Sequence, residues 1–367
     1  MDNTTKKMKL NRRARLIANY LPQYHPIPEN NLWWGTGFTE WTNVTKAKPL
    51  YKGHYQPNLP ADLGFYDLRV PEIRAAQAEL AKEHGIEGFA YWHYWLGSGK
   101  RLLERPFEEV LTTGEPNFPF CLGWANHSWT GVWFGAPDKT LVEQTYPGWE
   151  DHEEHFYYLL RAFSDHRYIT VEGKPLFLIF RPLEIPDVKE VVEFWRKLAH
   201  KEGLNGLHLV AGGLDLEKAI KLGFDASSYS HHRLVDQLLP KNKLLKKLVN
   251  KYRAVLKKPA TYTYQEAMPY FLKAGKAPLN EYPSIVPNWD STPRCQERGV
   301  VLYNSTPELF RKHFREALDK VADKPFENRI LFAKSWNEWA EGNYLEPDQR
   351  FGKAYLEAIK EEIFTGD

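Results

Sequence analysis

The sequence has very few cysteines, no long hydrophobic run and almost no net charge. Cys121 and Cys295 are the only cysteines among 367 residues, too few for a disulfide framework or a cysteine-based metal centre. The net charge of +2 gives no electrostatic reason to expect nucleic acid as a partner. No apolar run is long enough to span a membrane. With 43% hydrophobic and 26% charged residues, the composition is that of a soluble globular protein.

The N-terminal stretch lacks the apolar segment of a secretory signal. Residues 1–14 are polar and basic, and we expect them to be disordered or extended. The expected localisation is cytoplasmic for the sequence as it stands. It becomes periplasmic or secreted if the natural chain carries a leader that is absent here.

Several catalytic motifs are also missing. There is no G-x-x-x-x-G-K-[ST] phosphate loop, no G-x-G-x-x-G after a strand, no G-x-S-x-G elbow and no evident D-x-D element. The pairs His231-His232 and His152-x-x-His155 have no matching ligands at metal-binding spacing, so no metal is expected. These absences disfavour hydride transfer, phosphoryl transfer and serine hydrolysis, and they indicate no cofactor.

Aromatic residues, in contrast, are abundant. The chain has 13 Trp, 20 Tyr and 20 Phe, which together make 14% of its residues. Many of them stand beside polar residues at the ends of apolar runs rather than inside them. This placement favours a carbohydrate-binding cleft over simple filling of a core.

Strand-like runs alternate with helix-like segments along the chain. The predicted strands are 16–24, 86–95, 118–126, 175–181, 207–212, 224–229, 284–289 and 330–336. The predicted helices lie near 70–84, 101–113, 149–164, 187–202, 215–222, 306–321 and 352–364. Eight such alternations predict an α/β fold, a (β/α)8 TIM barrel formed by residues 15–367 as a single domain. A doubly wound open sheet is the alternative. In a barrel, functional residues are expected at the C-terminal ends of the strands.

Two segments are longer than ordinary loops. The first, His25–Leu68, is rich in Gly, Pro, Trp and Asn and predicts an ordered lid or cleft wall. The second, about 231–265, predicts a basic helical insertion, with nine Lys or Arg and one Asp between His231 and Ala260. Two interpretations of it stay open: a solvated insertion, or contact of residues 231–260 with an anionic membrane or a lipid-linked glycan.

The most informative stretch is 329–342, Arg-Ile-Leu-Phe-Ala-Lys-Ser-Trp-Asn-Glu-Trp-Ala-Glu-Gly. It begins as a buried strand and ends with Glu338 and Glu341, which are adjacent to Trp336 and Trp339. An E-x-x-E alone is usually the solvated first turn of a helix. After a strand and among indoles, it predicts a catalytic acid and base, because apolar surroundings can keep one carboxyl protonated while the other ionises. Glu346 and Asp348 are interpreted as structural.

Further candidates stand where other strands end or in the long first loop. For His93 a buried core role remains an alternative, whereas the amide of Asn126 suits vicinal hydroxyls. The predicted substrate-binding residues are Tyr20, Tyr24, Glu40, Trp41, Trp92, His93, Trp95, Trp124, Asn126, Tyr229, Trp289, Trp336 and Asn337.

Five stretches resemble the WbsX-like proteins, which in turn are similar to glycoside hydrolase family 99 (endo-α-mannanases and endo-α-mannosidases). They are ANYLPQYH at 18–25, WGTGFTEWTNV at 34–44, GFAYWHYW at 88–95, WAN at 124–126 and WNEWAEG at 336–342. The resemblance to the WbsX-like group covers residues 15 to 360. That to the hydrolases rests mainly on the expected fold and the E-W-x-E element.

The resemblance implies a (β/α)8 barrel without a metal, and a retaining mechanism in which the 2-hydroxyl of the sugar attacks C1. Glu338 would deprotonate that hydroxyl, and Glu341 would protonate the leaving group and then activate water. This chemistry needs α-manno- or α-rhamno-configured substrates, in which O2 and the leaving group are trans. The hydrolases carry His in the third position of E-W-x-E, where this chain has Ala340, so the subsite contacts and substrate differ.

Three functions compete at this stage. The first is a glycoside hydrolase acting on an oligo- or polysaccharide. The second is a WbsX-type glycosyltransferase in surface-polysaccharide (O-antigen or capsule) biosynthesis, favoured by the basic insertion and the missing signal. A glycan-binding protein without catalysis is disfavoured by the intact Glu338 and Glu341 pair.

Overall fold

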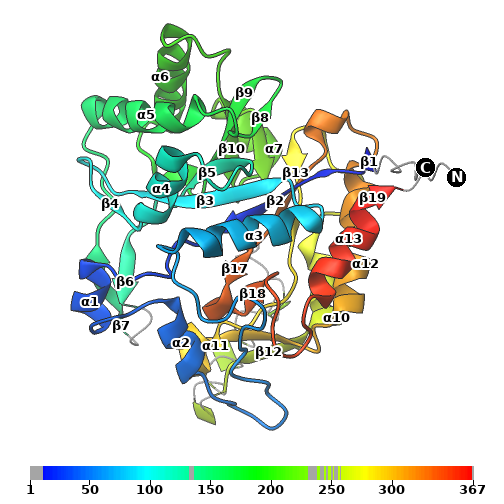
Figure 1. Ribbon diagram of the computed structural model, residues 1–367. Helices are drawn as coiled ribbons and strands as arrows, with labels where there is room; N and C mark the ends of the chain where they lie inside the picture. Colours follow the sequence, from blue (N-terminus) through cyan, green and yellow to red (C-terminus); the bar gives the residue numbers. More distant parts are fainter. Residues whose placement is uncertain are drawn as a thin grey trace, which may run out of the picture.

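The computed structural model describes residues 11–131, 136–229 and 258–365, together with isolated positions between 230 and 257. Its centre is a parallel sheet that curves into a nearly closed barrel, with helices packed around the outside (Figure 1). The strand order around the barrel is β13-β11-β10-β9-β5-β3-β2-β16-β14. The bounds are β2 (Arg15–Tyr20), β3 (Gly88–Trp95), β5 (Phe120–Trp124), β9 (Lys174–Ile179), β10 (His208–Gly212), β11 (Ala226–Ser228), β13 (Glu281–Tyr282), β14 (Ser284–Ile285) and β16 (Ile330–Ala333). The predicted barrel is confirmed.

The seventh barrel position is one segment interrupted by a proline. β13 pairs with β11 on one side and β14 pairs with β16 on the other, and Pro283 lies between them. Proline has no N–H to donate, but the Pro283 carbonyl still accepts the Phe332 N–H at 3.0 Å. The two ends of the sheet therefore meet in residues 281–285, which closes the barrel.

The predicted helices form on the outside of the barrel. They are α3 (Pro71–Glu83), α4 (Arg105–Thr113), α5 (Trp149–Phe163), α6 (Val188–Lys201), α7 (Leu216–Lys221), α12 (Pro307–Val321) and α13 (Ala354–Ile363). Proline stands in the first turn of α3, α4 and α12, where its missing N–H costs no hydrogen bond. The Thr306 side chain caps α12 by accepting the Leu309 N–H.

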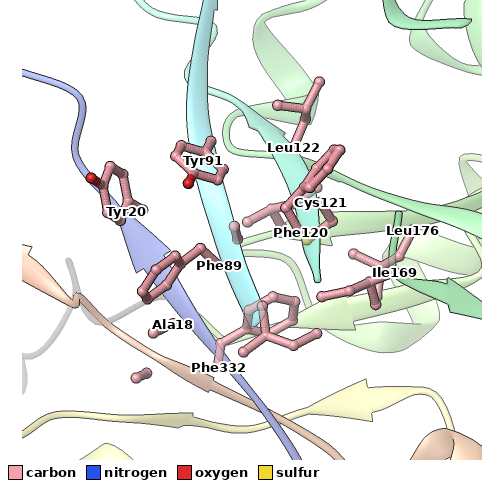
Figure 2. Close-up of a cluster of buried hydrophobic side chains, with 14 of the residues drawn as sticks. Ala18, Tyr20, Phe89, Tyr91, Phe120, Cys121, Leu122, Ile169, Leu176 and Phe332 are labelled. Carbon is pink, nitrogen blue, oxygen red and sulfur yellow. The ribbon is translucent and has the colours of Figure 1, made fainter. Parts of the chain in front are cut away.

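An aromatic layer fills the space between the sheet and the helices. Figure 2 shows Tyr20, Phe89 and Tyr91 beside one another on adjacent strands β2 and β3. The ring centroids of Tyr20 and Tyr91 are 4.5 Å apart, and Tyr91 continues the contact to Phe107 of α4 at 5.3 Å. Alternate residues of these strands are therefore committed to the core, which leaves the other face of each strand for the barrel interior.

The loops after the strands carry shorter elements. The long first loop contains α1 (Pro28–Trp34) and α2 (Glu40–Lys46). The loops beyond β5, β9, β14 and β16 carry β6 (Trp129–Gly131), β7 (Ala136–Val142), η2 (Pro182–Glu184), α11 (Thr292–Cys295), η4 (Gln296–Arg298), β17 (Asn337–Glu338), η6 (Trp339–Glu341) and β18 (Asn343–Tyr344). Elsewhere lie β4 (Arg101–Leu102), β8 (Thr170–Val171) and η5 (Phe326–Asn328).

The predicted basic insertion lies largely outside the described residues. Where the description resumes, residues 260–263 are extended rather than helical: β12 (Ala260–Thr263) pairs with β15 (Val300–Tyr303) and leads into α10 (Tyr264–Phe271). The run Ala-Thr-Tyr-Thr favours a strand because β-branched and aromatic residues suit a pleated surface.

The two ends of the described chain are joined. β1 (Asn11–Arg12) pairs antiparallel with β19 (Phe364–Thr365), and residues 1–10 lie outside the described residues. Among the helices that the structure describes, none has the length and apolar character needed to cross a membrane.

Candidate active site

A cavity of about 770 Å³ opens at the C-terminal ends of the barrel strands. β3 itself and residues that follow β2, β5, β9, β14 and β16 contribute to its wall, and α1 adds Trp34 from the long first loop. Both predicted catalytic residues, Glu338 and Glu341, line it. A concave site with aromatic walls and convergent polar groups is the usual form of a small-molecule site.

A tight turn after β16 positions the two glutamates. The Ser335 hydroxyl accepts the N–H groups of Asn337 and Glu338 at 3.1 and 2.9 Å, which bends the chain out of the strand. The single turn η6 then carries Glu341, and Gly342 ends it with a φ of +54°. The side chain of Glu338 is 10% exposed and that of Glu341 is 22% exposed, so Glu341 is the more accessible from the cavity.

Two cations lie beside the pair. Arg294 of α11 contacts the Glu341 carboxylate at 2.8 Å and the Glu338 carboxylate at 3.8 Å. Lys334, which directly follows β16, contacts Glu338 at 2.8 Å and Glu341 at 3.7 Å. Each glutamate therefore has one close cation and one more distant cation.

A third carboxylate holds Arg294 in place. Glu40, the first residue of α2, is completely buried and contacts Arg294 at 2.6 Å. Its carboxylate also accepts the Ala340 N–H at 3.1 Å, which ties the long first loop to the turn that carries the glutamates. The predicted site residue Glu40 thus supports the site from behind rather than lining the cavity.

The pKa values of the two glutamates shift in opposite directions. Burial raises the pKa of Glu338, and the negative charge of Glu341 raises it further. Burial also acts to raise the pKa of Glu341, but Arg294 and Lys334 outweigh it, so the pKa of Glu341 is lowered. Of the two carboxyls, Glu338 is therefore the one that binds a proton more readily.

The charge balance of the cluster also favours one proton among its carboxyls, and burial raises the pKa of Glu40 as well. Glu40, Glu338 and Glu341 are three carboxyl groups, whereas Arg294 and Lys334 are two cations. A buried cluster of this kind is neutral when the carboxyls share one proton, and unpaired buried charge is costly. One protonated and one ionised glutamate are the state that acid–base chemistry on a glycosidic bond requires.

Strand alternation decides which predicted residues reach the cavity. On β3, Trp92 lines the cavity together with Tyr94, which sequence reasoning did not select. His93 and Trp95 instead point toward α5, where His93 lies 2.9 Å from His155 and the Trp95 indole contacts Asp151. The structure thus places the predicted substrate-binding residues His93 and Trp95 on the core face of β3. Successive side chains of a strand point to opposite faces, so neither His93 nor Trp95 can share the cavity face with Trp92.

The same correction applies to three other strands. Tyr20 donates to Gln77 of α3 at 2.7 Å, Trp124 packs against His155 and Trp195, and Trp336 packs against Phe89. The neighbours Leu21 and Ala125 line the cavity in place of Tyr20 and Trp124, and Lys334, two residues before Trp336, also lines it.

Four more expected residues brace the loops. The Tyr24 hydroxyl donates to the Asn337 carbonyl, and the Trp41 indole donates to the Tyr66 carbonyl. The Asn337 amide bonds both the N–H and the C=O of Leu21. Asn126 accepts the Arg181 N–H at 2.8 Å and donates to the Arg181 carbonyl. Each of them is fully satisfied by protein groups, so none is directed at a ligand.

Of the last two predicted substrate-binding residues, one lines the cavity and the other does not. Trp289 lines the cavity, and the Lys334 ammonium lies 5.4 Å from its ring centroid. Tyr229 lies away from it, beside a small hollow near Lys273.

The predicted substrate-binding residues do not include several that line the cavity, namely Trp34, Tyr94, His127, Trp129, Phe180, Arg181, Arg294 and Lys334. Lys334 had a detectable signal, because it interrupts an apolar strand run four residues before Glu338. Arg294 had none, since it lies in a loop whose path depends on the barrel.

A fourth acidic residue lies directly behind the turn. Glu346 is buried and accepts hydrogen bonds from the Trp339 indole at 2.6 Å, Gln77 at 2.7 Å and the Tyr66 hydroxyl at 2.8 Å. Burial raises its pKa to about 7 despite these donors. Its contacts are those of a structural residue. In the described part of the chain, no three His, Cys, Asp or Glu residues are grouped so as to hold a metal ion.

The chain matches a known protein family over most of its length. The family model described as "Glycosyltransferase WbsX" matches residues 16–359. Two curated relatives, each named "Uncharacterized protein WxcX", come from two strains of Xanthomonas campestris pv. campestris. Both are 35% identical over 355 residues, covering 95% of this chain and 50% of the relative. The chain therefore spans about half the length of the curated relatives that it matches.

Solved structures share the fold at low sequence identity. A "Glycoside hydrolase-like protein" matches with a TM-score of 0.58 at 14% identity, covering 100% of this chain and 98% of the other. The family 99 endo-α-mannosidase of Bacteroides thetaiotaomicron matches in two structures with TM-scores of 0.55 and 0.53, each at 14% identity. They cover 95% of this chain and 96% and 95% of the other.

Proposed function

The chain belongs to the glycosyltransferase WbsX family, and we propose from this membership and the site geometry that it acts on a glycosidic bond with Glu338 and Glu341 as the reacting pair. The observation that carries the proposal is a glutamate pair in an aromatic-walled cavity at the C-terminal end of the barrel. A proton shared within a neutral cluster supports it. The proposed substrate is an oligo- or polysaccharide with α-manno or α-rhamno configuration.

The proposed reaction is cleavage with retention through the sugar's own 2-hydroxyl. Glu338 removes the proton of O2, and O2 bonds to C1 as the C1–O bond to the leaving sugar breaks. Glu341 gives a proton to that leaving oxygen. Water then opens the 1,2-anhydro ring at C1, with Glu341 accepting a proton from the water and Glu338 returning one to O2. The resemblance to family 99 implies these roles, and the separate cations fit two carboxyls with different tasks.

The roles require the shared proton to move when substrate binds. The pKa shifts favour the proton on Glu338 in the free protein, whereas the reaction needs it on Glu341. A sugar hydroxyl bound between the carboxyls would replace their direct interaction, and Lys334 at 2.8 Å would then stabilise the Glu338 carboxylate. Glu341, with more exposure, is the carboxyl that faces the leaving group.

Leaving-group dependence separates the two roles. Glu341→Gln should lower turnover of an α-linked manno- or rhamno-oligosaccharide by about 10²- to 10⁴-fold, the typical worth of general acid–base catalysis. It should lower turnover of the matching dinitrophenyl glycoside much less, because that leaving group needs no proton. Glu338→Gln should lower both rates, and a 2-deoxy substrate should not react.

Kinetics of reducing-sugar and dinitrophenol release would provide these rates, with Glu193→Gln on the exposed side of α6 as the matched control. The two roles would be reversed if Glu341→Gln slowed turnover of both substrates equally while Glu338→Gln slowed the dinitrophenyl glycoside much less than the oligosaccharide. Wild-type turnover in both variants would exclude the pair from the reaction.

Transfer to a sugar acceptor is the second candidate function, favoured by the description of the matched family. The same steps give transfer if an acceptor hydroxyl replaces water. A nucleotide diphosphate donor is less favoured, because the cavity cations are already paired: Arg181 contacts Glu184 at 2.6 Å, and Arg294 and Lys334 contact the glutamates.

Product analysis by mass spectrometry distinguishes the candidates. Longer glycans formed only with an activated sugar donor would support the transferase, and free reducing sugar in water would support the hydrolase. Contact of 231–260 with an anionic membrane or a lipid-linked glycan stays a proposal, because that segment lies largely outside the described residues.

A further inference from the structure

A second cavity of about 500 Å³ lies beside the candidate active site. Trp289 lines both cavities, so the two are neighbours. Its walls come from residues 51–58 of the long first loop, from β12 and β15, and from the segments around Tyr344 and Tyr355. The cleavage reaction proposed above uses none of these residues.

The partition between the cavities is the turn that carries Glu341. The Asp290 N–H donates to the Glu341 carbonyl at 2.7 Å. A Cβ atom added to Gly342 would lie 2.6 Å from the Asp290 nitrogen, so the two backbones are in direct contact. Glu341 lines one cavity and Gly342 lines the other, so the backbone of this turn forms the wall between them.

Protein donors already satisfy the acidic groups of the second cavity. The Asp290 carboxylate accepts from His54 and Gln56 at 2.7 Å each and from the Thr292 hydroxyl at 2.6 Å. The Leu50 N–H donates to His54 Nδ1, which places the His54 proton on Nε2, toward Asp290. These carboxylate oxygens are therefore not available to a ligand.

Asp348 is satisfied in the same way. It accepts from the Tyr344 hydroxyl at 2.7 Å and from the N–H groups of Arg350 and Phe351 at 2.9 and 2.6 Å. No described carboxylate in this cavity is left for a cation or for catalysis.

Aromatic rings and neutral polar groups remain accessible. Tyr55 and Tyr303 are 43% and 40% exposed, large values for tyrosines that line a cavity. Asn58 and Asn304 add amides, and the Arg350 guanidinium lies 4.7 Å from the Tyr55 ring centroid at the rim. Flat rings beside amides and phenols suit the apolar face and hydroxyl edge of a pyranose.

We propose that this second cavity is a subsite for a further pyranose unit of the glycan chain whose bond lies at Glu338 and Glu341. The identity of the ligand as a sugar rests on the proposed function. Trp289 lines both spaces, so a glycan chain that passes this indole would place its reacting bond at the glutamates and a further unit in the second cavity. The subsite would make the protein select longer glycans over short ones.

Binding as a function of glycan length tests the subsite without turnover. The probes are α-linked manno- and rhamno-oligosaccharides of increasing length, titrated calorimetrically into the Glu341→Gln protein. Affinity should rise with length beyond the units that fill the first cavity. Adding Tyr303→Ala should remove that gain, weakening the longest ligand about tenfold, the size of one good aromatic contact, and leaving the shortest unchanged.

Tyr270→Ala is the matched control, since Tyr270 is 41% exposed on α10 and lines neither cavity. Tyr55→Ala should reproduce Tyr303→Ala. The subsite is overturned if Tyr303→Ala weakens the binding of all glycan lengths equally or of none. It is also overturned if neither the manno- nor the rhamno-oligosaccharides bind. A length gain that Tyr303→Ala removes, in a protein that turns over no glycoside, would refute the proposed reaction and leave the subsite standing.

Discussion

At the scale of single residues, Arg294 is the cation that joins the parts of the site. It contacts Glu40 from α2 and Glu341 from η6, and it is itself 9% exposed. Because these residues come from three loops, the position of Glu341 depends on a side chain nearly fifty residues away in the sequence. Removing one partner of a buried ion pair leaves the other charged and unpaired, which costs more than the pair contributes.

We therefore expect Arg294→Met to lower the free energy of unfolding by about 3–5 kcal/mol. Adding Glu40→Gln should recover part of that loss, because it removes the unpaired buried charge. Urea unfolding of both variants gives the two values. Lys221→Met is the control: Lys221 and its partner Glu217 are 72% and 82% exposed, so the change should cost less than about 1 kcal/mol. A loss in Arg294→Met no larger than in this control would contradict the assignment.

At the scale of elements, β3 shows how one strand divides its side chains between two environments. Tyr94 lines the cavity, and burial and the charge of Glu338 raise the pKa of its hydroxyl, which therefore stays protonated. His93 lies on the opposite face, where burial lowers its pKa to about 3. The two neighbours should therefore respond differently to mutation.

Tyr94→Phe should lower kcat/KM by up to about tenfold, the worth of one hydrogen bond, with little change in stability. His93→Phe should leave kcat/KM unchanged and lower stability at pH 7. His93 stays neutral in the folded protein, so its contribution is complete above about pH 6.5 and is lost as the pH falls toward 3. The difference in unfolding free energy between wild type and His93→Phe should therefore shrink in that window. A large kcat/KM loss in His93→Phe would return this residue to the site.

The sequence predicts the strands and helices themselves, but it does not predict which face of a strand each side chain occupies. The alternation of apolar runs and amphipathic segments located the eight barrel positions, and seven of the predicted strands start within two residues of the observed ones. The prediction for the seventh starts at 284 and omits β13, because Pro283 divides that position. The choice between Trp92, His93, Tyr94 and Trp95 needs the strand's facing, which a run of four consecutive aromatics conceals. Hydrophobic periodicity carries no information where both faces are equally aromatic.

At the scale of the whole molecule, loops from distant parts of the chain meet in one partition. The loop after β14 supplies Asp290, the turn after β16 supplies Glu341 and Gly342, and the long first loop supplies His54 and Gln56. The barrel brings these loops to one rim because the C-terminal ends of all parallel strands lie on the same side. The contact between Asp290 and Gly342 therefore depends on the correct placement of all three loops.

A pair of glycines isolates this contact. Gly342 and Gly352 have φ values of +54° and +53°, but an added Cβ at Gly352 would meet nothing within 4 Å. Gly352→Ala should cost only the backbone strain of about 1–2 kcal/mol. Gly342→Ala should cost more and should also lower kcat, because Asp290 must move away from the Glu341 carbonyl. Calorimetric Tm and kcat of both variants make the comparison, and equal effects would show that the partition tolerates displacement.

The sequence by itself determined the barrel, the position of its strands and helices, and the glutamate pair, because periodicity and a dense local motif are properties of neighbouring residues. Only the tertiary structure decided that Glu40 and Asn337 brace the site, that Arg294 and Lys334 neutralise it, and that a second aromatic hollow lies behind Trp289. Those relations join residues far apart in the chain, and they exist only because barrel closure brings separate strand ends to one rim.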